Sequence, residues 1–294
     1  MESPARVGAM SNEAPLVLWR DAFILEVQHG PLSLRIRARS DGSTDTVAAE
    51  EAAKAALGAL EELAPQRLML ATPAWRLRPS PGWSRVLRLM VDAAVQTGDH
   101  TLTPMAAVAG SIAQVALEAG ARVGVGTMIV ENGGDIALMV APGDSVRIGV
   151  AESIERRRPT HVVTIDSSSG IGGICTSGLG GRSFTQGVAE AAVAVSRTAA
   201  LADACATVLG NATNVTHPAV EQRRARDLDP TTDIPDLLVT TRVGSLPHDV
   251  VSRSLEQAAS AGRLLLAGGA LQGAIVRVCG RAVLLPPEIA EPVK

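Results

Sequence analysis

The most constraining feature of the sequence is a glycine-rich stretch from Gly170 to Phe184, in which six of fifteen residues are glycine. Glycine accepts positive φ and lets the backbone lie directly against a ligand. Small hydroxyls at Thr176, Ser177 and Ser183 and a cation at Arg182 stand among the glycines. This composition suits phosphate oxygens or another anion. The stretch therefore predicts a polar cradle for an anionic ligand.

A second segment, from Leu201 to Asn211, has apolar residues at helical spacing and one charged residue, Asp203. Asp203 and Thr207 are four residues apart, so both side chains should face the same side of the helix. A carboxylate among alanines should be paired or bound, and carboxylate, hydroxyl and carbonyl oxygens are ligands that magnesium accepts. The alternative, favoured on spacing alone, is that Asp203 is a charge near a helix N-terminus, stabilised by the dipole.

Four ordered motifs resemble those of the ApbE family. They are Thr103–Gly110, Asn132–Ile136, Thr176–Gly178 and Ala202–Thr207. The well-studied members of that family are magnesium-dependent flavin transferases that cleave FAD and attach FMN to a Thr or Ser of a target protein. The resemblance covers most of the chain, from about Leu32 to Asn211, and is nearest to a shorter, uncharacterised cytoplasmic branch.

The resemblance implies Mg²⁺ and FAD as cofactors. It implies that Asp203 and Thr207 hold the metal, with the carbonyl of Ala206 as a third ligand. It also implies that the Asn132–Asp135 segment lies beside the nucleotide and that the Thr176–Arg182 loop contacts phosphate or substrate. The expected cofactor-binding residues are Asn132, Gly133, Gly134, Asp135, Thr176, Ser177, Gly178 and Arg182.

Hairpin chemistry is a competing interpretation of the segment that begins at Asn132. Asn-Gly-Gly between two apolar runs is a strong turn signal on its own. Turn chemistry explains Asn132, Gly133 and Gly134, but it explains Asp135 less well. Both interpretations stay open.

One departure from the family affects the expected reaction. Flavin transferases carry a His-Ile-Asp-Pro-x-Thr-Gly segment near the Thr-Ser-Gly motif, whereas here Gly181–Gly187 reads Gly-Arg-Ser-Phe-Thr-Gln-Gly and His-Ile-Asp-Pro occurs nowhere. Two functions therefore stay open, and the catalytic residues are unknown. The first is an enzyme that transfers FMN or cleaves FAD, and the second is a non-catalytic flavin or anionic-metabolite binding or assembly protein in redox or sulfur metabolism.

Three residues near the motifs have a predicted structural role. Cys175 could be a nucleophile, because a thiolate near Arg182 would have a lowered pKa, but we favour a small buried residue that ends a strand. Thr103 is expected to be a helix N-cap followed by a proline in the first turn. Gly110 is expected to be a close packing point.

The amino-acid composition limits the classes of molecule that the protein is expected to bind. Aromatic residues make up 2% of the 294 residues, tyrosine is absent and the net charge is −3, which argues against a nucleic-acid partner. The few aromatics also leave open a ligand other than a flavin. Three cysteines lie far apart and no apolar run reaches membrane-spanning length, so we expect a cytoplasmic protein with reduced thiols and no membrane partner. A protein acceptor and a homo-oligomer stay open.

Strand and helix patterns alternate irregularly, which predicts an α+β fold of mixed sheets flanked by helices. The resemblance implies a ligand cleft between two intertwined halves. We expect a disordered lead (1–14), one domain (15–285) and a loose tail (286–294). The expected helices are 45–63, 84–94, 103–119, 201–211 and 250–261, with a long loop at 212–236. The expected strands are 23–27, 32–38, 126–131, 136–140, 145–150, 161–166, 173–176, 191–196, 238–243, 273–278 and 281–284.

Overall fold

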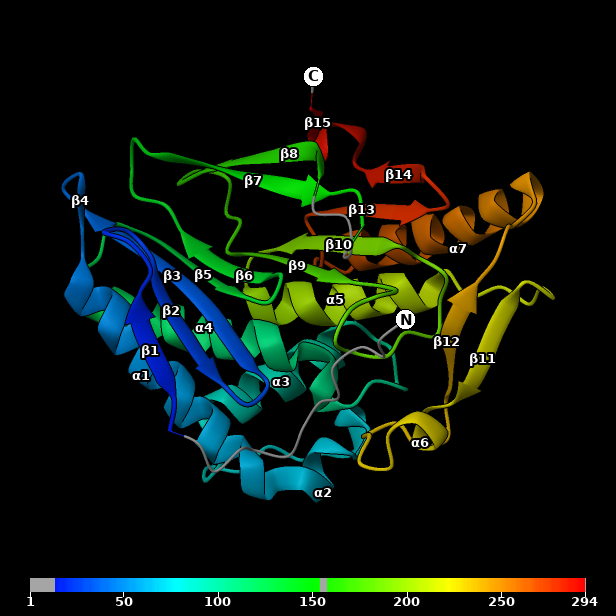
Figure 1. Cartoon of the computed structure of the whole chain (residues 1–294), viewed down its shortest axis with the longest axis horizontal. Coiled ribbons are helices and arrows are strands. Elements are labelled where there is room, and N and C mark those ends of the chain that lie inside the picture. The colour runs from blue at the N-terminus through cyan, green and yellow to red at the C-terminus, as the bar shows by residue number, and fades with distance from the viewer. Residues whose placement is uncertain (1–13, 154–157, 294) are drawn as a thin grey trace.

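A ten-stranded antiparallel sheet forms the centre of the molecule (Figure 1). The computed structural model describes residues 14–153 and 158–293. The strand order is β1-β2-β3-β5-β6-β9-β10-β13-β14, and β4 pairs with β3. The strands are β1 (Leu16–Trp19), β2 (Leu25–His29), β3 (Leu32–Ser40), β4 (Ser43–Thr44), β5 (Thr127–Asn132), β6 (Asp135–Met139), β9 (Gly173–Ser177), β10 (Ala191–Ser196), β13 (Gly273–Val278) and β14 (Arg281–Leu285).

Helices cover one face of this sheet; most of them lie below it in Figure 1, and the last one lies to the right, beside β13 and β14. The α-helices are α1 (Thr46–Leu63), α2 (Arg67–Leu70), α3 (Arg85–Gln96), α4 (Val108–Arg122), α5 (Ala199–Ala212), α6 (Ala225–Leu228) and α7 (His248–Ala267). Short 3₁₀ helices are η1 (Ala64–Gln66), η2 (Ala74–Arg76), η3 (Pro104–Ala107) and η4 (Pro287–Ile289). The main apolar core lies between sheet and helices and includes Leu34, Ile36, Met90, Met128 and Leu209, each at most 2% exposed. Among residues 14–153 and 158–293, no helix is long and apolar enough to span a membrane.

A small sheet covers part of the other face. It has the order β15-β8-β7 and consists of β7 (Ser145–Ala151), β8 (Pro159–Asp166) and β15 (Glu291–Pro292). A second apolar cluster fills the space between the two sheets, with Val163 and Ile165 from β8 against Ile174, Val193 and Ile275 of the main sheet. Its inward-facing residues alternate with polar ones along β8, as expected for a sheet with one solvated face.

The predicted α+β class is confirmed, and the predicted helices and most strands appear within a few residues of their expected bounds. The expected long loop at 212–236 is wrong, because it contains β11 (Val220–Arg224) and α6, and β11 pairs with β12 (Leu238–Val243) in a separate two-stranded sheet. Strand β11 was not predicted because it is polar and largely exposed, so apolar and polar residues do not alternate along it. Of the expected lead, 1–13 lies outside the described residues. In the expected loose tail, β15 pairs with β8.

Thr103 differs from its expected role. It precedes η3 with Pro104 in the first turn, but its side chain makes no capping hydrogen bond. The hydroxyl instead donates to the carboxylate of Asp233, 130 residues away in the chain. A side chain with a distant partner of this kind cannot be identified from local pattern alone.

Glycine lets α4, α5 and the sheet approach closely. A Cβ added at Gly110 would collide with the carbonyl oxygen of Ala199 and lie 2.8 Å from the Cβ of Asp203. A Cβ added at Gly173 in β9 would collide with the backbone of Ala199, at the start of α5. The expected close packing at Gly110 is confirmed. These contacts fix the first turns of α5 against both the sheet and the start of α4.

We expect Gly110→Ala to lower the free energy of unfolding by about 1–3 kcal/mol, because the added methyl group overpacks the α4–α5 contact. Gly58 is the matched control, since it lies inside α1 with nothing within 4 Å of an added Cβ. Gly58→Ala should raise stability by about 0.5–1 kcal/mol through helix propensity. Urea unfolding monitored by circular dichroism measures both. Equal effects of the two substitutions would contradict the close packing.

Candidate functional site

The candidate site forms where the start of α4 meets α5 and the ends of β5, β6 and β9. Asp203 lies in the second turn of α5, whose own N-cap is Thr198. The half-buried Asp203 carboxylate accepts a hydrogen bond from the Gly110 amide at 2.8 Å, and the Ala109 amide also contacts it. Asp203 therefore caps α4, whose N-cap residue Ala107 has no capping side chain. Asp203 thus lies beyond the first turn of its own helix, and its charge is placed at the N-terminus of a neighbouring one.

Thr207 lies one turn after Asp203 and faces the same segment, as the spacing predicts. Its hydroxyl donates to the carbonyl oxygen of Ala106 in η3 at 3.3 Å. Ala206 lies inside α5, where a carbonyl accepts the helical hydrogen bond from the residue four positions on. The side chains of Asp203 and Thr207, rather than the Ala206 carbonyl, therefore supply the oxygens that face the start of α4.

The β5–β6 turn brings a second carboxylate to this place. Gly133 and Gly134 adopt positive φ values of 66° and 123°, so turn chemistry accounts for both glycines. Asp135 connects the turn to β9: its Oδ1 accepts a hydrogen bond from the Thr176 amide at 3.1 Å. The buried Asn132 side chain donates to the Ala109 carbonyl oxygen at 3.2 Å. The turn is thus tied both to β9 and to the start of α4.

Arg182 connects the glycine-rich loop to two hairpin turns. Its Nη1 donates to the carbonyl oxygen of Pro31 at 2.6 Å, and its Nη2 donates to that of Asn132 at 3.3 Å. The guanidinium lies directly over Gly133, where a Cβ would collide with it. Its positive charge lowers the pKa of both Asp135 and Asp203, opposing larger effects of burial.

The two carboxylates of the site are under electrostatic strain. Burial raises the pKa of Asp135 to about 6, against the opposing hydrogen bond from the Thr176 amide and the charge of Arg182. Burial, and after it the negative charge of Asp135, raise the pKa of Asp203 well above its usual range. A cation between or beside the carboxylates would relieve both effects.

The structure does not bring all the predicted residues to one point. Ser177 points toward α5, with its hydroxyl 3.5 Å from the place that a Cβ on Gly210 would take. Gly178, at φ +140°, packs against the carbonyl oxygen of Ala189. The residues that meet around the start of α4 are Asn132, Gly133, Asp135, Thr176, Arg182, Asp203 and Thr207.

Cys175 fits the structural interpretation. Its side chain is fully buried in β9, and its Sγ donates to the Ala199 carbonyl oxygen at 3.3 Å. Burial and the nearby charges of Asp135 and Asp203 raise the pKa of the thiol well above its usual range. A thiol with these surroundings is not an activated nucleophile.

The residues present fit a hard divalent cation. Two carboxylates and the Thr207 hydroxyl supply oxygen donors, and a positive charge would offset the burial that raises the pKa of Asp135 and Asp203. Within residues 14–153 and 158–293, no group of three or more His, Cys, Asp or Glu side chains is arranged as a metal cage. Magnesium suits this situation, because it is held by one or two carboxylates together with water and phosphate oxygens.

Sequence reasoning missed the backbone half of the site. The amides of Ala109 and Gly110 hold Asp203, and the carbonyl oxygens of Ala106 and Ala109 hold Thr207 and Asn132. These groups all belong to the Thr103–Gly110 motif. The motif indicated that this segment belongs to the site. It did not indicate that the backbone of the segment, rather than its side chains, would contact the other motifs.

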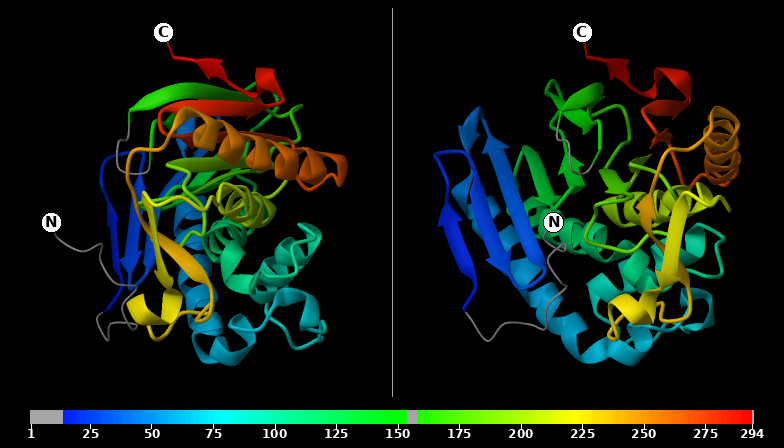
Figure 2. Two further views of the ribbon diagram at one scale, coloured as in Figure 1. Left: turned by 90° about the vertical axis from the view of Figure 1, so that its right-hand side faces the viewer. Right: turned by 45° about the vertical axis from the view of Figure 1, so that its right-hand side comes forward.

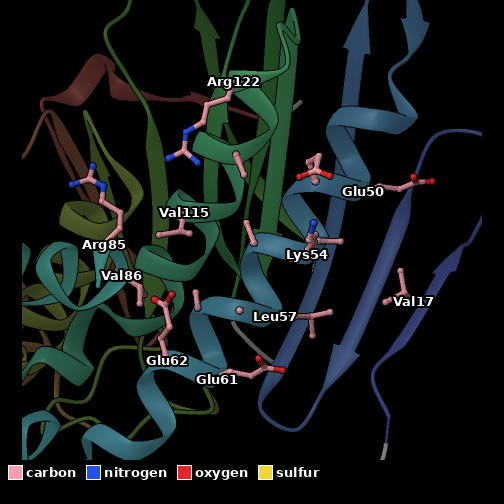
Figure 3. A pocket seen from close by; sticks show the side chains of 16 residues that line it. Val17, Glu50, Lys54, Leu57, Glu61, Glu62, Arg85, Val86, Val115 and Arg122 are labelled. Atoms are coloured by element: carbon pink, nitrogen blue, oxygen red, sulfur yellow. The ribbon is translucent and has the colours of Figure 1, made fainter. Parts of the chain in front are cut away.

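A groove of about 790 Å³ lies elsewhere, on the outer surface of α1, α3 and α4 (Figure 3). Glu61, Glu62 and Lys54 of α1 line it, with Arg85 of α3 and Arg122 of α4 across from them. None of the predicted site residues lines this groove. It therefore contributes nothing to the candidate site.

We expect the stability of the protein to fall between about pH 4 and pH 6, because folded Asp135 retains a proton that the unfolded chain has already released. The unfolded state binds fewer protons in this range, so the free energy of unfolding decreases as the pH rises. Asp135→Asn should remove the part of this loss that Asp135 causes, so its free energy of unfolding should exceed that of the parent by about 1–2 kcal/mol at pH 8, with a smaller difference near pH 4. The raised pKa of Asp203 leaves a loss of its own in both proteins. Urea unfolding at both pH values tests this, and a difference independent of pH would contradict it.

Sequence comparisons extend across this whole region. The model of a family described as AbpE bacteria matches residues 17–284. UPF0280 proteins from Methanosarcina barkeri and Methanopyrus kandleri are 35% identical over 185 residues and 32% identical over 222 residues. These matches cover 61% and 73% of this chain and 70% and 88% of those proteins. A UPF0280 protein from Methanosarcina acetivorans is 39% identical over 137 residues, which are 46% of this chain and 52% of that protein.

A structural comparison gives a similar chain in the crystal structure of the apo form of Pseudomonas stutzeri flavinyl transferase ApbE. The TM-score is 0.49 at 14% sequence identity, and the match covers 94% of this chain and 95% of the other.

The family model spans the four motifs that build the candidate site, from Thr103 to Thr207. The chain therefore belongs to the ApbE-like family that this model describes.

Proposed function

We propose that the protein binds a flavin nucleotide, or a related phosphorylated ligand, together with magnesium at the candidate site. The observation that carries this proposal is the pair of half-buried carboxylates, Asp135 and Asp203, that share one cation, Arg182. Ionised together, these three groups leave a net negative charge. A phosphate entering alone would be repelled, whereas a magnesium ion that binds with it would place a positive charge beside the carboxylates.

Each residue then has a specific role. Asp203 and Thr207 would hold the metal from α5, while the backbone at the start of α4 fixes the positions of both side chains. Arg182, at the exposed end of the glycine-rich loop, would contact phosphate, and the β5–β6 turn would lie beside the nucleotide. When bound, magnesium would neutralise charge that develops on a pyrophosphate during FMN transfer or FAD cleavage.

A second candidate function is binding without transfer. The segment that replaces His-Ile-Asp-Pro serves as scaffold here. The Thr185 carbonyl oxygen accepts from the Thr240 amide at 2.8 Å, and the Gln186 amide donates to the Asn211 side chain at 3.0 Å. These backbone contacts hold the loop in place, and the segment 181–187 contains no carboxylic acid or histidine that could act as an acid or base. This observation favours a carrier or assembly protein for a flavin or another anionic metabolite.

The deciding experiment mixes purified protein with FAD, with and without Mg²⁺, and follows bound flavin and released AMP by chromatography. We expect FAD binding to require Mg²⁺ and to be lost in Asp203→Asn, because the amide removes the charge while its oxygen can still accept from Gly110. AMP release that requires Mg²⁺ and Asp203 would establish cleavage or transfer. Binding without AMP would establish the carrier function.

Asp249→Asn is the matched control, since Asp249 is exposed on α7. It should bind FAD as the parent does. Folded Asp203→Asn that binds magnesium and FAD with unchanged affinity would refute the metal site. A parent that neither binds nor cleaves FAD would refute the flavin proposal, and a screen of other phosphorylated metabolites would replace it.

A further inference from the structure

An arm of the molecule, from Val220 to Val243, reaches the candidate site from the side opposite β1–β3. It consists of β11, α6 and β12, and it lies to the right in Figure 1 and in the right view of Figure 2. Among the described residues, 14–153 and 158–293, its two strands pair only with each other and do not extend the main sheet. Specific contacts at its base and tip therefore hold the arm in place.

The base of the arm is fixed to the glycine-rich loop. Besides the Thr240 amide on Thr185, the Thr240 hydroxyl and the Gln222 side-chain amide both donate to the Gln186 carbonyl oxygen at 3.0 Å. Thr240 is buried, as is its neighbour Val239. Residues 185 and 186 follow Arg182 closely in sequence, so the base of the arm is attached to the segment that carries Arg182.

The tip of the arm is hydrogen-bonded to Thr103, which precedes η3. The Asp233 carboxylate accepts from the hydroxyl of Thr103, which is 4% exposed. Within residues 14–153 and 158–293, the other hydrogen bonds of the 229–236 tip stay inside the arm. One example is the Asp229 carboxylate, which accepts from the amide and hydroxyl of Thr231.

Thr103 leads directly into the backbone that holds the site. Its carbonyl oxygen accepts from the Ala106 amide at 3.2 Å, and the Ala106 carbonyl oxygen accepts from Thr207. Helix α4 starts two residues later, and its Gly110 amide holds Asp203. A displacement of Thr103 would therefore move the groups that position both proposed metal-binding side chains.

We propose that Asp233 is a positioning residue of the candidate site, which acts by holding Thr103 and with it η3 and the start of α4. The contact spans 130 residues of sequence and joins the arm to the residue that precedes η3. We call this Thr103–Asp233 hydrogen bond the latch. It can open, because one hydroxyl compensates only part of the free-energy cost of shielding a carboxylate from water. The arm thus connects the segment that follows Arg182 with the residue that leads into η3.

Hydrogen exchange followed by mass spectrometry tests the latch on the ligand-free protein. Thr103→Val removes the hydroxyl at nearly constant volume, and it should raise exchange about tenfold in peptides covering 229–237 and 103–112. Asp233→Ala breaks the same bond from the exposed arm and should give the same pattern, so the test survives if Thr103→Val folds poorly. Thr103→Ser, which keeps the hydroxyl, should restore the parent pattern.

Thr231→Val is the matched control, because it removes a hydroxyl from the tip without touching Thr103. It should leave exchange at 103–112 unchanged. Unchanged exchange at the tip in both latch variants would overturn the latch. Faster exchange at the tip with no change at 103–112 would overturn the positioning role, because the start of α4 would then be held independently of the arm.

The ligand-binding readout rests on the proposed function. Thr103→Val and Asp233→Ala should weaken Mg²⁺-dependent FAD binding about five- to tenfold, with Thr103→Ser close to the parent. Folded latch variants with parental affinity would overturn the positioning role. If the parent itself binds no FAD, the proposed function fails, and the exchange experiment still decides whether Asp233 positions the start of α4.

Discussion

The rest of the site depends on the contact between the Asp203 carboxylate and the first amides of α4. Capping by a carboxylate contributes about 0.5–2 kcal/mol to a helix, and here it also joins two helices that are distant in sequence. The contact requires Gly110, since any side chain there would push α5 away from α4. One interaction therefore fixes the helix start, the position of the carboxylate and the direction in which Thr207 points.

The same arrangement places a second carboxylate where it lowers the stability of the fold. Asp135 faces the sheet–helix junction, and its burial is only partly offset by the Thr176 amide and the Arg182 guanidinium. A fold optimised for stability alone would carry a neutral residue at this position. Strained charges of this kind concentrate at binding sites, because the ligand supplies the compensating charge. The electrostatic strain and the family motifs thus point to the same place by independent arguments.

Periodicity and turn chemistry were sufficient to predict most elements, because α1, α3, α4 and the buried strands carry clear apolar patterns. The i, i+4 spacing also predicted that Asp203 and Thr207 face one side. The partners of these residues could not be predicted, since Asp203 meets Gly110 across 93 residues and Arg182 meets Pro31 across 151. Such contacts follow from how α4, α5 and the turns pack, and this packing cannot be predicted from the local sequence. The exposed strand β11 lacked a pattern altogether.

The choice between enzyme and carrier depends on the segment between Arg182 and Gly187. Its first residue points over the β5–β6 turn and toward the carboxylates, while Thr185 and Gln186 are engaged by the arm and by Asn211. A loop held at both ends can orient a phosphate, but orientation alone does not move a proton. Any group transfer here would have to rely on the metal and on an acceptor that brings its own nucleophile. In the proposed function the chain's own residues would bind and orient the ligand, and the chemistry would come from the metal and the acceptor.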